Sequence, residues 1–90
     1  MGDLSLQKEY KMTITAVPAA TWTSVTTTTE DTAFQNRGGS VMYLTTVATG
    51  ALELNDGIAV PVGSVAVVGT GKDVSVSFPQ GAGSVFSIGV

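Results

Sequence analysis

Three uncharged, valine-rich segments at regular spacing constrain the fold of this chain more than any other feature. They are residues 65–68, 74–78 and 85–90, and clusters containing Gly with Asp or Pro separate them. Strands that begin about 8 to 12 residues apart, with turn residues between them, are typical of a β-sandwich or a small barrel. Within residues 74–78, apolar side chains alternate with serine, which is the period of a strand with one buried side. The pattern predicts an antiparallel all-β domain.

The rest of the chain fits the same fold class. Val and Thr occur 13 times each, and their β-branched side chains favour strands over helices. We expect about seven strands in residues 20–90, arranged as a small antiparallel β-sandwich or barrel. Residues 51–54 are expected to form one of the short strands. Phe34, Phe78 and Phe86 are predicted to lie in the core.

The clearest predicted turn lies at Gly38–Gly39. Two candidate strands, residues 32–37 and 40–47, flank it. Paired glycines tolerate the positive φ values that two-residue hairpin turns require. We therefore predict that these two segments form a β-hairpin.

The amino-terminal part of the chain differs from the rest. It holds two of the four bases, and its start has an acid at position three with no apolar segment, unlike a secretory signal. We predict an extended arm over residues 1–19, followed by the β-domain over residues 20–90. The apolar residues of the arm are candidate interface residues: Leu4, Leu6, Tyr10 and Met12.

The absence of two residue types excludes much enzyme chemistry. The chain has no His and no Cys, which removes imidazole bases, thiolate nucleophiles and the usual ligands of zinc, haem and iron–sulfur centres. A serine or threonine nucleophile would need Lys8, Lys11 or Lys72 as its base, and no Ser-x-x-Lys spacing occurs. We expect no enzymatic activity, no catalytic residue, no cofactor and no metal site.

Two local motifs lack the spacing that their chemistry requires. The segment Gly69–Lys72 lacks the earlier glycine and the following hydroxyl of a phosphate-binding loop, because Ala66 and Asp73 occupy those positions. We interpret it as a hairpin turn. Oxygen ligands cluster at residues 53–56, but Leu54 interrupts the alternating spacing of a calcium loop. The acids there, like Glu30–Asp31, are interpreted as solvated turn residues.

Charge is scarce and unevenly distributed. Lys and Arg number 4 and Asp and Glu number 7, for a net charge of −3, so we expect no nucleic-acid partner. No stretch of about 20 apolar residues predicts a membrane span. Residues 38–90 contain only Glu53, Asp56, Lys72 and Asp73 as charged residues. This distribution favours a neutral surface that other subunits partly cover, with Trp22 and Tyr43 as further interface candidates.

Several segments together resemble the short β-rich virion proteins of tailed bacteriophages, which decorate or cement the capsid or form knobs and short fibres on it. The segments are Trp22–Val25, Asp31–Ala33, Gln35–Gly39, Val41–Leu44 and Phe86–Ile88. The similarity covers about residues 20–90 and consists of hydroxyl-rich strands, an Asn-x-Gly-Gly turn, little charge and no cysteine. It supplies no functional residues.

The resemblance implies a role and a location. The expected role is that of a capsid decoration or cement protein, made in the host cytoplasm and bound to the capsid surface of the virion. The expected partners are the major capsid protein or other virion subunits, and further copies of the chain, as a trimer. The alternatives are a carbohydrate-binding or host-recognition module of a fibre or tail, with Trp22 or Tyr43 as the stacking ring, and a tail or adaptor component.

Overall fold

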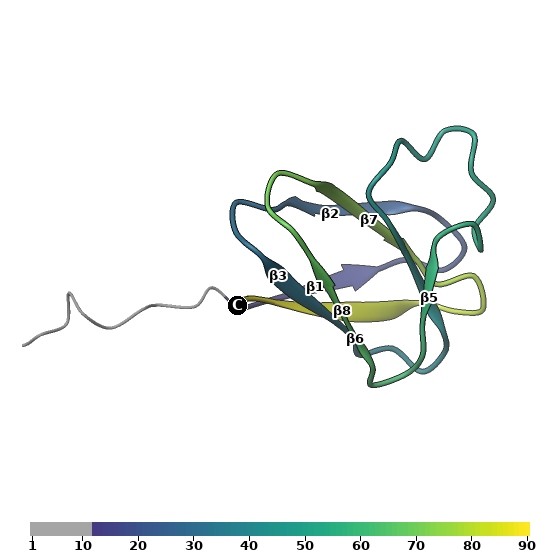
Figure 1. Cartoon of the computed structure of the whole chain (residues 1–90). Coiled ribbons are helices and arrows are strands. Elements are labelled where there is room, and N and C mark those ends of the chain that lie inside the picture. Colours follow the sequence, from purple (N-terminus) through teal and green to yellow (C-terminus); the bar gives the residue numbers. More distant parts are fainter. Residues whose placement is uncertain (1–11) are drawn as a thin grey trace, which may run out of the picture.

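The computed structural model describes residues 12–90, which form eight β-strands and no helix (Figure 1). The strands are β1 (Met12–Val17), β2 (Thr23–Thr27), β3 (Thr32–Asn36), β4 (Met42–Thr45), β5 (Ile58–Val60), β6 (Val65–Val68), β7 (Asp73–Ser77) and β8 (Gly83–Gly89). The predicted all-β fold is confirmed, with one strand more than the seven expected.

The eight strands form two antiparallel sheets of four. Sheet I has the order β1-β8-β3-β6, and sheet II has the order β2-β7-β4-β5. Every connection between consecutive strands passes from one sheet to the other, except the connection from β4 to β5. This is the strand order of an eight-stranded jelly roll, a β-sandwich built from two Greek keys.

The additional strand is β1, which lies in the segment predicted to be part of the arm. It pairs with β8 along its whole length, from Met12 opposite Ile88 to Val17 opposite Gly83. Alternation of Thr with larger apolar residues in this segment suits a strand, and Val17 is buried in the core. The predicted boundary at residue 19 is therefore too late, because the sandwich already includes residues 12–17.

The core lies between the two sheets and draws on both. Val74, Val76 and Phe78 share the inward side, in agreement with the predicted alternation, and Phe34 is also fully buried. The buried apolar residues are Val17, Phe34, Met42, Leu44, Val60, Val68, Val74, Val76, Phe78 and Val85. A single apolar layer therefore holds the two sheets together.

The predicted hairpin at Gly38–Gly39 is wrong, because β3 and β4 belong to different sheets. The fully buried Asn36 directs this crossing. Its side-chain amide donates hydrogen bonds to the carbonyls of Ser40 at 2.8 Å and Val60 at 2.9 Å, and its Oδ1 accepts one from the Gly38 N–H at 2.8 Å. These bonds fasten the end of β3 to the neighbouring sheet, which a pattern of turn residues alone does not reveal.

The predicted strand at residues 51–54 is also wrong. Residues 46–57 form a long loop between β4 and β5 (Figure 1). Its turns are closed by backbone hydrogen bonds from Leu52 N–H to the Thr49 carbonyl and from Asp56 N–H to the Glu53 carbonyl, each 3.1 Å long. Local turns satisfy the backbone there, so the segment does not pair with a strand.

Candidate protein-binding face

The outward side of sheet I is apolar across all four strands. Pairing in register places these side chains in two rows. One row is Met12, Ile88, Ala33 and Val67, and the other is Ile14, Phe86, Gln35 and Val65. These eight residues are called the apolar face below. Only one of them, Gln35, is polar.

Several side chains of the apolar face are largely open to solvent. Met12 is 66% exposed, Ile14 64% and Val67 65%. Four strands at a spacing of about 4.8 Å make the face about 19 Å wide. Soluble monomers rarely expose larger apolar patches than about 300–600 Å², and patches of that size mark interaction sites. The apolar face is therefore the best candidate for a binding surface in the described part of the chain.

One charged side chain borders the apolar face. The Arg37 guanidinium lies 4.9 Å from the centre of the Phe86 ring, and its Nε donates a 2.6 Å hydrogen bond to Oε1 of Gln35. An exposed contact between a cation and an aromatic ring contributes about 0.5–1 kcal/mol. Arg37 thus lies against the face and orients Gln35, which leaves a cation at one edge of an otherwise neutral surface.

The outward side of sheet II is different. Its outward residues include Ser24, Ser75 and Thr45, and part of this side is covered by the 46–57 loop. The Ser77 hydroxyl donates a 2.6 Å hydrogen bond to the Leu54 carbonyl, and the Trp22 indole N–H donates one of 3.2 Å to the Glu53 carbonyl. Sheet II is therefore polar on its outward side and partly protected by its own chain.

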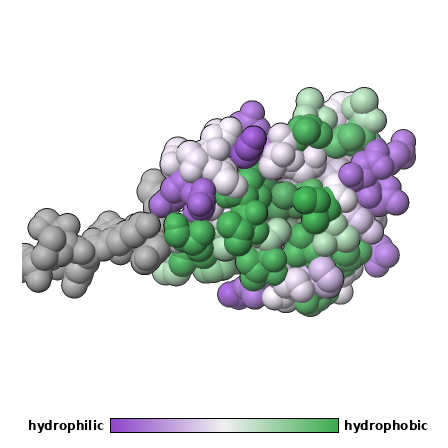
Figure 2. All heavy atoms as spheres, viewed as in Figure 1, coloured by the Kyte–Doolittle hydropathy of each residue, from purple (hydrophilic) through white to green (hydrophobic). Residues whose placement is uncertain are grey.

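The apolar surface continues around one side of the sandwich. Figure 2 shows apolar side chains gathered in a band where β5 and β6 lie toward the viewer. Ile58 of β5 is 66% exposed and Val65 of β6 is 54% exposed. Both strands are at the edges of their sheets, and edge strands with exposed apolar side chains invite contact with other chains.

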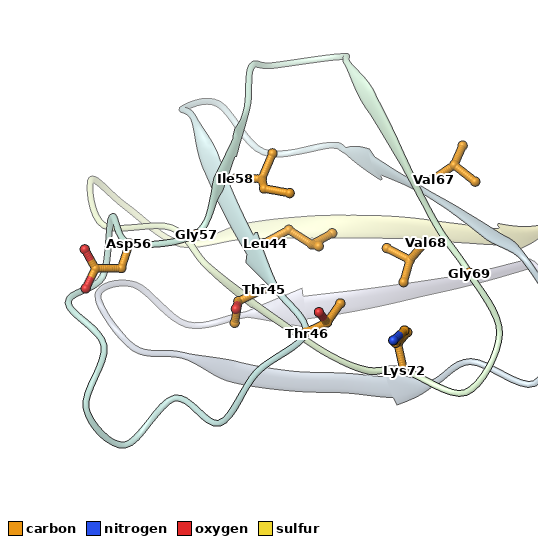
Figure 3. A pocket seen from close by; sticks show the side chains of 10 residues that line it. All are labelled: Leu44, Thr45, Thr46, Asp56, Gly57, Ile58, Val67, Val68, Gly69 and Lys72. Carbon is orange, nitrogen blue, oxygen red and sulfur yellow. The ribbon is translucent and has the colours of Figure 1, made fainter.

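A groove opens between these two edge strands. It has a volume of about 430 Å³ and lies between β4 and β5 on one side and β6 on the other (Figure 3). Leu44, Ile58 and Val68 contribute apolar side chains, and Lys72 and Asp56 lie at opposite ends of the lining. The further lining residues are Thr45, Thr46, Gly57, Val67 and Gly69.

The predicted interface residues that the structure describes lie in two separate places. Met12 belongs to the apolar face. Trp22 and Tyr43 lie on the side of sheet II, where Trp22 is bound to the 46–57 loop and Tyr43 lines a cavity of about 280 Å³. The remaining three, Leu4, Leu6 and Tyr10, are outside the described residues.

Sequence reasoning missed most of the apolar face. Phe86 was predicted to be in the core, but it is only half-buried and faces outward, while its neighbours Val85 and Ser87 are buried. Both sides of β8 carry apolar residues, so alternation alone does not tell which side is inside. The sequence signal for the apolar face was the period of two in residues 12–17 and 83–89. That signal identifies the outward side only when the pairing of the two strands is considered as well.

The segment Gly69–Lys72 is a turn, but the predicted hairpin there is wrong, because β6 and β7 belong to different sheets and do not pair. The buried Thr28 holds it: the Thr28 hydroxyl donates to the Gly69 carbonyl at 2.6 Å and accepts from the Lys72 N–H at 2.9 Å. Within residues 12–90, no group of three or more acidic, His or Cys side chains lies close enough together to hold a metal ion. The same residues contain no helix suited to crossing a membrane.

Comparison of the chain with family models, with curated proteins and with solved structures found no match in any of the three. The function must therefore be inferred from the surfaces themselves.

Proposed function

We propose that this chain is a structural virion protein, a capsid decoration or cement protein of a tailed bacteriophage that binds other virion subunits through its apolar face. The observation that carries the proposal is the apolar outward side of sheet I, with Met12, Ile14 and Val67 each more than half exposed. A surface of this kind needs a protein partner to remove it from water.

The proposed mechanism is repeated weak attachment to the capsid surface of the virion. Burial of apolar surface contributes about 25 cal/mol per Å² before the costs of association are subtracted. One face of this size therefore gives modest affinity. Many copies on a regular shell, each joined to adjacent sites and to one another, gain avidity without strong single contacts.

The jelly-roll fold is compatible with this role but does not decide it. Jelly rolls occur in viral capsid domains and also in lectins, and one fold supports many functions. The distribution of charge adds support. All charged side chains of residues 12–90 lie in loops, apart from Asp73 at the start of β7, so a partner covering sheet I meets no charge on the strands themselves.

The test is binding of the purified chain to undecorated capsids. We expect saturable, stoichiometric binding that Ile14→Asp weakens at least about tenfold, because the new carboxylate would be buried in the contact. Ser24→Asp is the matched control, since Ser24 is exposed on the outward side of sheet II. Absence of saturable binding, or equal loss in the two variants, would contradict the proposal.

A specific observation favours a second candidate, a carbohydrate-binding module of a fibre or tail. Tyr43 lines the 280 Å³ cavity together with Glu53, Asn55 and Gln80, and an aromatic ring beside carboxylate and amide groups suits a sugar. Trp22 fits this role less well, because its indole N–H is bonded to the Glu53 carbonyl. A glycan-array signal that Tyr43→Ala abolishes would favour this candidate over attachment to the capsid.

The third candidate, a tail or adaptor component, predicts a different assembly. Such a component would form rings or tubes from the purified chain alone. Electron microscopy of the protein without capsids distinguishes this behaviour from decoration of a preformed shell.

A further inference from the structure

The groove between the two sheets is a second surface with its own chemistry. Its interior is apolar, because Leu44, Ile58 and Val68 line it, and its volume of about 430 Å³ is in the range of ligand sites. Ile58 is 66% exposed even though it pairs opposite the buried Leu44. The edges of β5 and β6 therefore leave part of the interior between the sheets open.

A cation and an anion lie on opposite sides of this opening (Figure 3). The backbone of Lys72 is held by Thr28, whose N–H donates to the Lys72 carbonyl at 2.8 Å and whose hydroxyl accepts from the Lys72 N–H at 2.9 Å. Asp56 is held in its turn by a 2.8 Å hydrogen bond from the Glu53 N–H to its Oδ2. The backbone of Lys72 is thus anchored, and the carboxylate of Asp56 is fixed by a bond to its own turn.

Gly57 keeps the groove in shape beside Asp56. A Cβ atom at this position would lie 2.6 Å from the Leu44 carbonyl oxygen, so only glycine permits this approach of the loop to β4. The result is an apolar slot with a positive end and a negative end. Its best occupant is an extended segment that carries an acid, then apolar side chains, then a base.

The chain contains such a segment. Residues 3–8 read Asp-Leu-Ser-Leu-Gln-Lys, with Leu4 and Leu6 between an acid and a base. The two leucines are two residues apart and would point to the same side of an extended segment. The segment therefore matches the groove in its order of charges and in its apolar centre.

The number of residues between this segment and β1 limits which groove the segment can reach, that of its own copy or that of a second copy. Met12 lies on β1, and β1 and β6 are opposite edges of sheet I, about 14 Å apart over three strand spacings. Four residues from Met12 back to Lys8 span at most about 14 Å when fully extended. Asp56 is farther still, on the side of sheet II, and a path to it must pass around the sandwich. Lys8 of the same copy therefore cannot lie beside Asp56, although Asp3, nine residues before Met12, is far enough along the chain to reach the groove.

We propose that residues 3–8 of one copy bind in the groove of a second copy, with Asp3 beside Lys72, Lys8 beside Asp56, and Leu4 and Leu6 against the apolar lining. This inference rests on the proposed role as an assembling protein and names one of its partners, the chain itself. Such a contact joins two different surfaces, so repetition closes a ring or links copies across a shell. Apart from Val67, which also lines the groove, it leaves the apolar face free for another partner.

The test uses charge reversal in the full chain, measured by sedimentation velocity without capsids. Lys72→Glu and Asp3→Lys each place like charges at one end of the groove, and each should weaken self-association about fivefold. An equimolar mixture of the two variants should restore it, because each arm then meets an opposite charge in the other variant. Ser24→Glu, away from the groove, should leave self-association unchanged.

Several results would overturn the inference. These are a wild-type chain that stays monomeric at tens of micromolar, reversals with no effect, and a mixture that associates no better than the single variants. Restoration in neither the mixture nor the double variant Asp3→Lys/Lys72→Glu would show that the two charges do not meet, and so would reject exchange. Capsid binding is measured separately with Ile14→Asp, so failure of one proposal is distinguishable from failure of the other.

Discussion

The two sheets contribute to the same core but differ on their outward sides. Sheet II presents hydroxyls such as Ser24 and Ser75, and the 46–57 loop covers part of it through bonds to Ser77 and Trp22. Sheet I presents Met12, Ile14 and Val67, each more than half exposed. Within the described residues, the chain protects one sheet and leaves the other open.

The fold itself does not require apolar side chains on the outward side of sheet I. Val and Thr have nearly the same shape, and both favour strands. Threonine in place of Val65 or Val67 would therefore suit an exposed position on β6 equally well, as it does at Thr26 and Thr27 on β2. Apolar side chains on the outward side of sheet I are better explained by contact with another protein than by folding.

The largest effect should come from the core that both sheets share. Phe34→Ala should lower the free energy of unfolding by about 3–5 kcal/mol, because Phe34 is fully buried. Phe86→Ala, on the open side of sheet I, should cost only about 1–2 kcal/mol. Equilibrium denaturation of both variants, with Phe34→Leu as a milder control, measures the two losses in the free energy of unfolding. Equal losses in the free energy of unfolding would mean that Phe86 is packed as tightly as a core residue, which would contradict an open outward side of sheet I.

The next effect concerns the crossing between the sheets. Asn36→Ala removes three hydrogen bonds and leaves the carbonyls of Ser40 and Val60 without this donor. The free energy of unfolding should fall by about 2–3 kcal/mol. Asn36→Asp keeps the acceptor for the Gly38 N–H but loses both donors, so it should be destabilising as well. A loss below about 0.5 kcal/mol in both variants would show that Asn36 does not fasten the sheets together.

A smaller effect is expected where the loop covers sheet II. Trp22→Phe keeps an aromatic ring but removes the hydrogen bond to the Glu53 carbonyl, and it should cost about 1 kcal/mol. Limited proteolysis should then cut within residues 46–57 faster than in the wild type. Unchanged cleavage there would indicate that this bond does not hold the loop.

The smallest change in stability is expected on the apolar face. Val67→Thr should shift the free energy of unfolding by less than about 0.5 kcal/mol, because Val67 is 65% exposed. Capsid binding should nevertheless weaken several-fold, since a hydroxyl would be desolvated in the contact. Chemical denaturation and capsid co-sedimentation measure the two quantities. If Val67→Thr lowered the free energy of unfolding but left capsid binding unchanged, the apolar face would serve folding and not binding.

The sequence predicted the features that depend on local pattern. The all-β class and the alternation of Val74, Val76 and Phe78 follow from side-chain period, and the structure confirms them. Turn chemistry also located a turn at Gly69–Lys72, but that turn joins the two sheets and is not the hairpin predicted. Sequence patterns did not predict the features that depend on which strands pair. Gly38–Gly39 looks like a hairpin turn locally, but Asn36 and its distant partner Val60 send the chain to the other sheet.

The candidate site was also only partly predictable. Met12 was identified because it is apolar within a polar segment, but its place on a sheet depends on pairing with β8. Ile14, Val65 and Val67 come together only because strands from both ends of the sequence are neighbours in sheet I. Phe86 was assigned to the core because aromatic residues are usually buried, and on β8 the smaller Val85 takes that place.

Methionine footprinting on the capsid tests the central claim most directly. Met12 is 66% exposed on the apolar face, whereas Met42 is fully buried in the core and serves as an internal reference. In the free protein, mild peroxide should oxidise Met12 much faster than Met42. On capsids, Met12 should become protected by about tenfold or more, while Met42 stays unreactive. A Met12 that oxidises equally fast in the bound and free protein would contradict binding through the apolar face.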